Sequence, residues 1–214
     1  MRILLFIILL IESTFTFSQN EGYVSSVEIS AGLLYPNKSK FGNPIQSSFN
    51  EAFESQKQFV ALKIEHPRNY SKQNLGAEIG INYYLNQTKS IGDTVKLNWF
   101  ANTVYAVYKY DLIPKNTYID VLLCGGGQLG AQRLIINDGT NTVYKNFNAA
   151  IIPQVEIKIQ PIKRFCFGVQ ANYIYDLTKG AWKKKTGNDF VIDDSKFSGF
   201  SVNAYLAWCW NTFY

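Results

Sequence analysis

The sequence contains few charged residues, which restricts the surfaces that it can present. Asp, Glu, Lys and Arg make up 17% of the 214 residues, whereas soluble domains contain about 25%. A surface with so little charge is either well buried or does not face water. The net charge of +5 is carried by scattered Lys residues, apart from the run at 183–185. No continuous basic face is indicated, so we expect no nucleic-acid partner.

Histidine and cysteine are also scarce, which disfavours most catalytic and metal sites. The only histidine, His66, lies next to Pro67 in a predicted short turn on the periplasmic side. A lipid hydrolase would need it beside a serine at the membrane-facing edge. Only Ser71 is near enough to leave an inner-leaflet hydrolase open as an alternative. The three cysteines do not have the spacing of a zinc site. We therefore expect a protein that is not an enzyme and that binds no cofactor or metal.

Long apolar runs are absent too. The run at residues 3–11 has nine members and is followed by Glu12, and no later stretch approaches 18, whereas a transmembrane helix needs about 20. Together with the small-x-small site Thr16-Phe17-Ser18, this run predicts a secretory signal peptide over residues 1–18, with an uncleaved anchor as the alternative. Residues 19–214 are expected to form a single domain. If the mature protein lies in a membrane, it does not cross it as helices.

An alternation of apolar and polar residues is present instead, and it recurs eight times. This period of two is the signature of a β-strand with one apolar face. The predicted strands cover residues 23–33, 60–65, 75–83, 97–110, 119–129, 146–159, 165–176 and 196–214. Polar connections of about ten to twenty residues follow the odd-numbered strands, and turns of about five to seven follow the others. An even strand count with long loops on one side is typical of outer-membrane barrels.

A sheet in hydrocarbon must close on itself, because an open edge would leave backbone N–H and C=O groups unpaired. The sequence therefore predicts an all-β fold, an eight-stranded antiparallel transmembrane up-and-down β-barrel. Two strands need a further assumption. The strand at 97–110 is apolar on both faces, and two Asn residues favour placing inward the face that carries Val104 and Tyr108. The strand at 146–159 contains Pro153, where we expect a bulge.

The charged strand residues fall on one face of the alternation. They are Glu28, Lys63, Glu65, Glu78, Asp120, Glu156 and Lys158. Turned inward, they would form a lumenal polar network that plugs the barrel, because unpaired buried charges are unfavourable. Lys63 would then lie within reach of Glu28 or Glu78. Turned outward, they would leave an apolar interior, as in a secreted lipocalin-like barrel that binds an apolar ligand.

Three features favour the inward orientation. The polar face is rich in Gly, Ser and Asn, which suits a crowded lumen, and the chain ends on an aromatic strand. Aromatic residues also stand at both ends of the apolar face, as two interfacial girdles would. The girdle residues are Tyr83, Tyr173, Tyr175 and Phe200 toward the long loops, and Phe165, Phe167, Trp208 and Trp210 toward the short turns.

The sequence resembles a known family in three places: the Thr16-Phe17-Ser18-Gln19 cleavage site, the Leu112-x-Pro114-Lys115-Asn116-x-Tyr118 turn, and the closing strand that ends in Tyr214. It is similar to the outer-membrane β-barrel domain family of Bacteroidota, which includes PorT-like proteins, and to small OmpA/OmpX-type barrels. The resemblance implies a location and a fold more than a task, because the family is functionally mixed. It also implies a signal read by the barrel-assembly machinery, formed by Leu206, Trp208, Trp210 and Tyr214, although Thr212 departs from that pattern.

Three further motifs have alternative readings. Cys166 and Cys209 fall near the same end of adjacent strands and could form a disulfide in an oxidising periplasm, or remain small lumenal residues. Residues 125–130 match the G-x-G-x-x-G pattern, but strand character continues after them, which disfavours a nucleotide site. The Lys residues at 183–185 could meet lipopolysaccharide phosphates or belong to a solvated loop.

We expect a non-enzymatic integral outer-membrane protein. It would contact outer-membrane lipid and act through its external loops, through lipopolysaccharide, or as part of the envelope or a secretion complex. The soluble lipocalin-like barrel is the alternative, and a pore is a third, weaker reading because eight strands enclose a filled lumen.

Overall fold

The computed structural model describes residues 26–37, 55–66, 75–91, 95–113, 118–137, 139–162, 164–187 and 196–209. The predicted signal peptide, Pro67, Ser71, Pro114, Trp210 and Tyr214 lie outside these residues. The strands are β1 (Ser26–Pro36), β2 (Lys57–His66), β3 (Leu75–Ile91), β4 (Val95–Asp111), β5 (Ile119–Asn137), β6 (Asn141–Ile162), β7 (Phe165–Asp176), β8 (Lys183–Thr186) and β9 (Gly199–Cys209). Within the described residues, no helix is long and apolar enough to cross a membrane.

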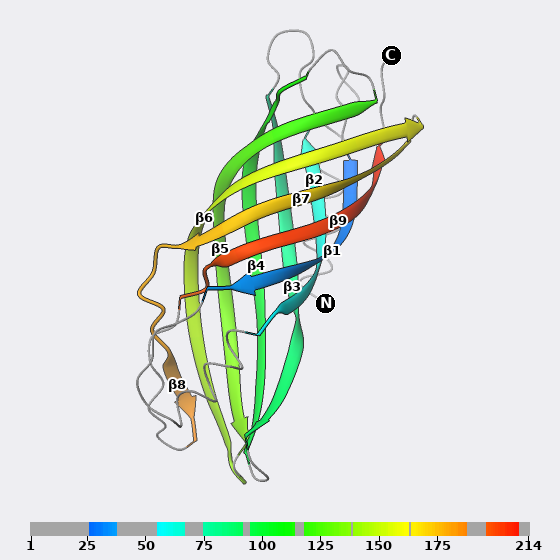
Figure 1. Cartoon of the computed structure of the whole chain (residues 1–214). Helices are drawn as coiled ribbons and strands as arrows, with labels where there is room; N and C mark the ends of the chain where they lie inside the picture. The colour runs from blue at the N-terminus through cyan, green and yellow to red at the C-terminus, as the bar shows by residue number, and fades with distance from the viewer. Residues whose placement is uncertain are drawn as a thin grey trace, which may run out of the picture.

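Eight of these strands close into a tilted barrel (Figure 1). Neighbours are hydrogen-bonded in the order β5, β4, β3, β2, β1, β9, β7 and β6, and pairing between β5 and β6 completes the ring. All the pairs are antiparallel. The prediction of an eight-stranded antiparallel barrel is therefore confirmed.

Two of the four predicted long connections are wrong. β3 and β4 are each 17 residues long, and β5 and β6 have 19 and 22, so strand replaces most of the polar sequence expected between them. Leu134 and Ile136, for example, are buried inside the barrel, while Arg133 and Asn137 on either side of them are exposed, so the alternation continues β5 to its turn. In Figure 1 these four strands extend well below the others. The barrel thus has one long side, which projects beyond its shorter strands.

The short strand β8 is an addition that the sequence pattern did not predict. Its position follows from the unequal lengths of β6 and β7. The β6–β7 pairing begins at Ala150 and Asp176, so the first part of β6 has no partner from β7. β8 pairs with β6 there, at Val143–Lys145, and covers an otherwise open edge.

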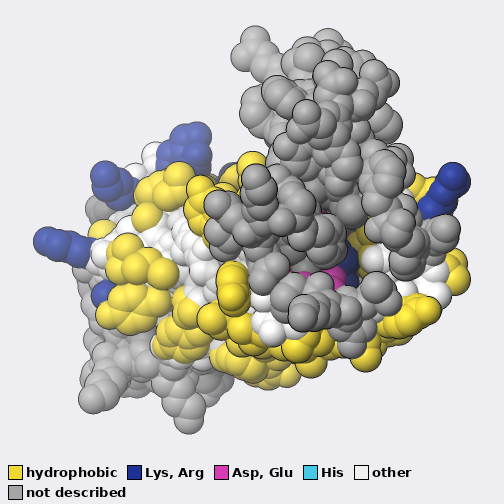
Figure 2. Space-filling model, turned by 90° about the horizontal axis from the view of Figure 1, so that it is seen from above, with side chains coloured by type: hydrophobic (Ala, Val, Ile, Leu, Met, Phe, Trp, Pro, Cys, Tyr) yellow, Lys and Arg dark blue, Asp and Glu magenta, His cyan; other side chains and the backbone are white. Residues whose placement is uncertain are grey.

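The two faces of the wall differ as the sequence predicted. Leu206 is 68% exposed and Val169 51%, whereas Glu78 and Glu156 are fully buried. Seen from above in Figure 2, hydrophobic side chains run around the outer wall, and a few Asp and Glu side chains are visible within it. A soluble barrel that holds an apolar ligand needs the opposite distribution, so the lipocalin-like alternative is not favoured.

The predicted orientation of strand four is wrong. Val104 and Tyr108 face outward, while Trp99 and Val107 are buried inside. Hydrophobicity could not distinguish the two faces, because apolar residues line the interior as well as the exterior here. Lys109, which shares the face of Trp99, was the signal that the sequence offered, since a lysine avoids the apolar exterior.

The expected bulge at Pro153 is also wrong. Pro153 pairs with Gly125 in an unbroken register between β5 and β6. Toward β7, Ile151 pairs with Tyr175 and Gln154 with Asn172, so the register is the same on both sides of the proline. The proline ring points outward. The ladder lacks only the hydrogen bond that the missing backbone N–H of Pro153 would donate, so no extra residue is inserted.

Candidate functional site

Buried charges fill the half of the lumen nearer the short turns. Lys109 on β4 is the central cation, since its Nζ contacts a carboxylate of Glu78, lies 2.9 Å from Glu156 and 3.8 Å from Glu65. Lys158 on β6 is a second buried cation, and its Nζ lies 2.5 Å from Glu65. These side chains come from four different strands, so the ion pairs tie the wall together across its interior.

The remaining members of the predicted network join at longer distances. Lys63 Nζ lies 3.9 Å from Glu28 Oε2, and Lys158 Nζ lies 3.8 Å from Glu28 Oε1. Asp120 stands opposite Lys158 in the β5–β6 register and is only half-buried. Six of the seven predicted lumenal residues are thus brought together, with Asp120 at the rim. Four glutamates face three lysines, so the cluster holds more acidic than basic groups.

Neutral side chains complete the coordination of these carboxylates. The Tyr105 hydroxyl donates to Glu78 at 2.6 Å, and the Tyr205 hydroxyl donates to Glu156 at 2.5 Å. Gln170 donates to Glu156 at 2.9 Å and accepts from Lys63. Lys109 and Tyr105 were not predicted as members of this cluster because strand four was placed the wrong way round. Tyr205 and Gln170 were not predicted because a neutral side chain gives no charge signal in the sequence.

An apolar cluster fills the other half of the lumen, which the sequence predicted to be polar throughout. Tyr84 packs edge-on against Phe197 at a centroid distance of 5.1 Å, and Trp99 stacks on Phe197 at 6.0 Å. Phe59 and Leu34 belong to the same buried cluster. Between the two halves, the described residues enclose a cavity of about 10 Å³, which is room for about one water molecule.

The four glutamates of the cluster are at most 4% exposed, so they are shielded from any substrate in solution. Each of the four buried glutamates has a lysine or a hydroxyl partner. Among the described residues, no group of three or more His, Cys, Asp or Glu side chains could hold a metal ion. The ion pairs and hydrogen bonds of this cluster can therefore hold the barrel strands together across the lumen.

The three cysteines are buried, and none of them is in a disulfide in this structure. Cys166 and Cys209 face each other across β7 and β9 with their sulfur atoms 2.9 Å apart. Because this contact needs little movement to become a bond, we expect them to form a disulfide after export to an oxidising compartment. Thiol titration of the denatured protein without reductant should then find only Cys124, and all three thiols after reduction. Three thiols in both samples would contradict the pairing.

The glycine motif at residues 125–130 lies within β5, which continues to Asn137 with no helix on which a phosphate could bind. The role of one glycine is steric. A Cβ on Gly126 would overlap the backbone carbonyl oxygen of Ala106 on β4, whereas a Cβ on Gly125 would meet nothing within 4 Å.

Replacing Gly126 with Ala is therefore expected to lower the free energy of unfolding by about 1–3 kcal/mol, because β4 and β5 must separate to admit the methyl group. The matched change Gly125→Ala should stay within about 0.5 kcal/mol. Urea unfolding of both variants in detergent tests the difference, and equal midpoints would contradict a steric role.

The predicted girdle residues that the structure describes lie on the outer wall. Phe165 packs edge-on against Trp208 at 4.6 Å near the short-turn end. Tyr173 is only half-exposed, and its hydroxyl accepts a hydrogen bond from Asn37. Tyr83 stands at the midpoint of β3, not near its end, because β3 is longer than predicted. The remaining girdle residues, which are Phe167, Tyr175 and Phe200, are also exposed on the outer wall.

No protein-family model matches the chain, and no curated protein matches it. Solved structures do resemble it. A major outer membrane protein from Thermus thermophilus is 11% identical, with a TM-score of 0.60 over 89% of this chain and 100% of that one. Ail, the attachment invasion locus protein of Yersinia pestis, crystallised with the heparin analogue sucrose octasulfate, is 10% identical, with a TM-score of 0.52 over 88% of this chain and 97% of that one. At these identities the likeness shows a shared fold, that of small outer-membrane barrels.

Proposed function

We propose that the chain is a non-enzymatic integral protein of a bacterial outer membrane. The observation that carries this proposal is the sidedness of the wall. Ile29 and Leu206, at 67% and 68% exposure, face outward on neighbouring strands, while Glu28 and Lys109 are fully buried. Apolar exteriors of this extent are unusual in soluble monomers but are required in lipid. The predicted signal peptide agrees with export to that membrane.

The protein acts, in this proposal, through its exterior and not as a pore. The ion pairs, the aromatic cluster around Phe197 and the small remaining cavity support a lumen that does not conduct. The projecting ends of β3–β6 and the connection that contains β8 provide the surface available to partners. A role in the envelope or in a secretion complex, as in the PorT-like proteins that the sequence resembles, would use this surface.

Biogenesis would follow the usual route for this fold. Leu206 and Trp208 face outward on the last strand of the barrel, where the barrel-assembly machinery would meet them. Trp210 and Tyr214 would extend the same signal but lie outside the described residues.

The test is expression with the native leader in a Gram-negative host. We expect the mature chain in the outer-membrane fraction, resistant to extraction by urea, with a band that migrates faster before boiling than after it. Planar bilayers that contain it should show no stable conductance. Recovery as a soluble periplasmic protein would contradict the membrane assignment, and steady single-channel currents would contradict the sealed lumen.

A further inference from the structure

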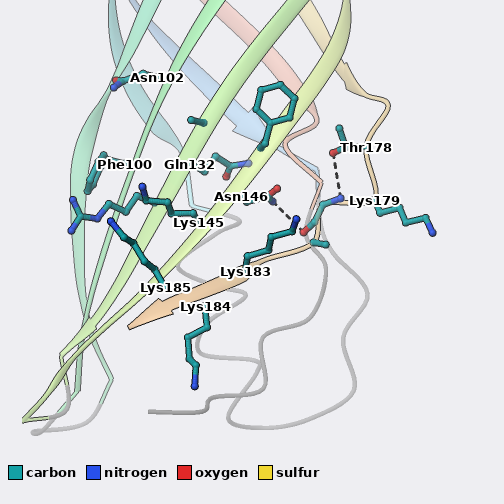
Figure 3. A pocket seen from close by; sticks show the side chains of 15 residues that line it. Phe100, Asn102, Gln132, Lys145, Asn146, Thr178, Lys179, Lys183, Lys184 and Lys185 are labelled. Carbon is teal, nitrogen blue, oxygen red and sulfur yellow. Dashed lines mark hydrogen bonds between the residues drawn. The ribbon is translucent and has the colours of Figure 1, made fainter. Parts of the chain in front are cut away.

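A groove of about 900 Å³ lies on the outer wall near the long-loop end (Figure 3). Its floor comes from β4, β5 and β6, and one side comes from Thr178–Ala181 and β8. None of the 15 residues that line it is acidic, whereas six are Lys or Arg. In Figure 3, the ammonium groups of Lys145 and Lys185 lie on the same side of the groove, Lys183 points toward Asn146, and Lys179 and Lys184 extend away.

Strand register places three of these residues at adjacent backbone positions. Arg133 on β5 pairs with Lys145 on β6, and Lys145 pairs with Lys183 on β8. Directly paired residues project from the same face of a sheet, and like charges in that position repel each other. Next to them, the Arg133 guanidinium lies 5.6 Å from the Phe100 ring centre. This row of Arg133, Lys145 and Lys183 is unfavourable by itself and becomes favourable when an anion lies across it.

The position of the row identifies the kind of anion. The next outward-facing pair toward the short turns is Ala131 and Phe147, and Phe147 is 59% exposed. Beyond it, the outward residues include the exposed Leu129 and Ile151. Along β5 and β6, the row therefore contains the first outward-facing charged residues between the apolar exterior and the long-loop end. In a membrane, this is the depth of the lipid headgroups.

We propose that the groove binds the phosphate groups of a lipid headgroup in the outer leaflet, the phosphorylated diglucosamine of lipopolysaccharide. Arg133 supplies a planar fork that can bind phosphate through two hydrogen bonds, and Lys145 and Lys183 supply point charges. Phe147 contacts the first part of the acyl chains below. This assignment rests on the proposed membrane location and adds a specific lipid contact to it.

The experiment measures binding of lipid A to the purified, folded protein in nanodiscs of zwitterionic lipid. The variant Arg133→Gln/Lys145→Gln/Lys183→Gln should bind lipid A roughly 100-fold more weakly, the effect of three cations that contribute about 1 kcal/mol each. The matched control Lys96→Gln/Arg164→Gln/Lys196→Gln removes one Arg and two Lys that are exposed elsewhere, and it should bind as the unmodified protein does. Lipid A stripped of its phosphates should bind the unmodified protein as weakly as intact lipid A binds the row variant.

Equal binding by the row variant and the control would overturn the proposal, as would equal binding of dephosphorylated lipid A. Sucrose octasulfate serves as a soluble polyanion. If it binds the row as tightly as lipid A does, the site is not one for a lipid headgroup. The band shift on boiling is recorded for every sample, so that a folded barrel without lipid A binding refutes only this inference. Loss of membrane integration would instead refute the proposed function.

Discussion

Replacing Lys109 with Met is expected to destabilise the barrel by about 3–5 kcal/mol, the cost of removing one partner from a buried ion pair. Met keeps most of the length of the side chain but leaves Glu78 and Glu156 without their nearest cation. Both carboxylates must then remain buried with insufficient compensation or take up protons. Urea unfolding in detergent, followed by tryptophan fluorescence, measures the loss of stability.

The control for this prediction lies on the same strand. Lys96 is exposed near the start of β4, and Lys96→Met should change the free energy of unfolding by no more than about 0.5 kcal/mol. Adding Glu78→Gln to Lys109→Met should recover part of the loss, because one unpaired carboxylate is removed. If Lys109→Met unfolds at the same urea concentration as Lys96→Met, the ion-pair cluster does not stabilise the barrel.

Replacing Leu206 with Arg is expected to cost about 1–3 kcal/mol in lipid vesicles, because the penalty for an arginine on the lipid face is about 2–4 kcal/mol at the middle of a bilayer and falls toward its surfaces. Leu206 points outward between Ile29 and Phe167, in the half of β1, β7 and β9 nearer the short turns. In water the same change on an exposed position would be nearly neutral. Equilibrium unfolding in vesicles measures the cost.

A matched arginine at the long-loop end provides the comparison. Asn141 is exposed at the start of β6, where an arginine should cost no more than about 1 kcal/mol. A large difference between Leu206→Arg and Asn141→Arg supports lipid contact along β9. Equal stabilities would mean that Leu206 does not face hydrocarbon.

The sequence predicted the wall well where one face carried charge. Glu28, Lys63 and Glu156 are charged residues that alternate with apolar residues along their strands, and each faces inward as predicted. The prediction failed where both faces were apolar. In β4, Trp99 belongs to an aromatic cluster inside the lumen, so its hydrophobicity did not mark the outside. A binary pattern cannot separate two apolar environments, whereas a single lysine in the same strand could have done so.

The groove could be predicted only in part from the sequence. The run at 183–185 was recognised as basic, but it was not predicted as a strand. Lys183–Thr186 forms a strand because it pairs with the part of β6 that β7 does not reach, and its four exposed residues show no apolar alternation. Arg133 and Lys145 were assigned to a loop, because the continuation of β5 and β6 beyond their predicted ends was missed. Their alignment with Lys183 is a property of register, which local sequence does not encode.

By itself, the sequence determined the alternating faces, the number of barrel strands and the inward position of most charges. These features are local, because the period of two belongs to each strand alone and a charged side chain is unfavourable on an apolar face whichever strand lies beside it. Tertiary structure decided which charges meet, where the lumen becomes apolar and how three cations align on the outer wall. These outcomes depend on strand length and stagger, and both are fixed only when distant strands pair and the ring closes.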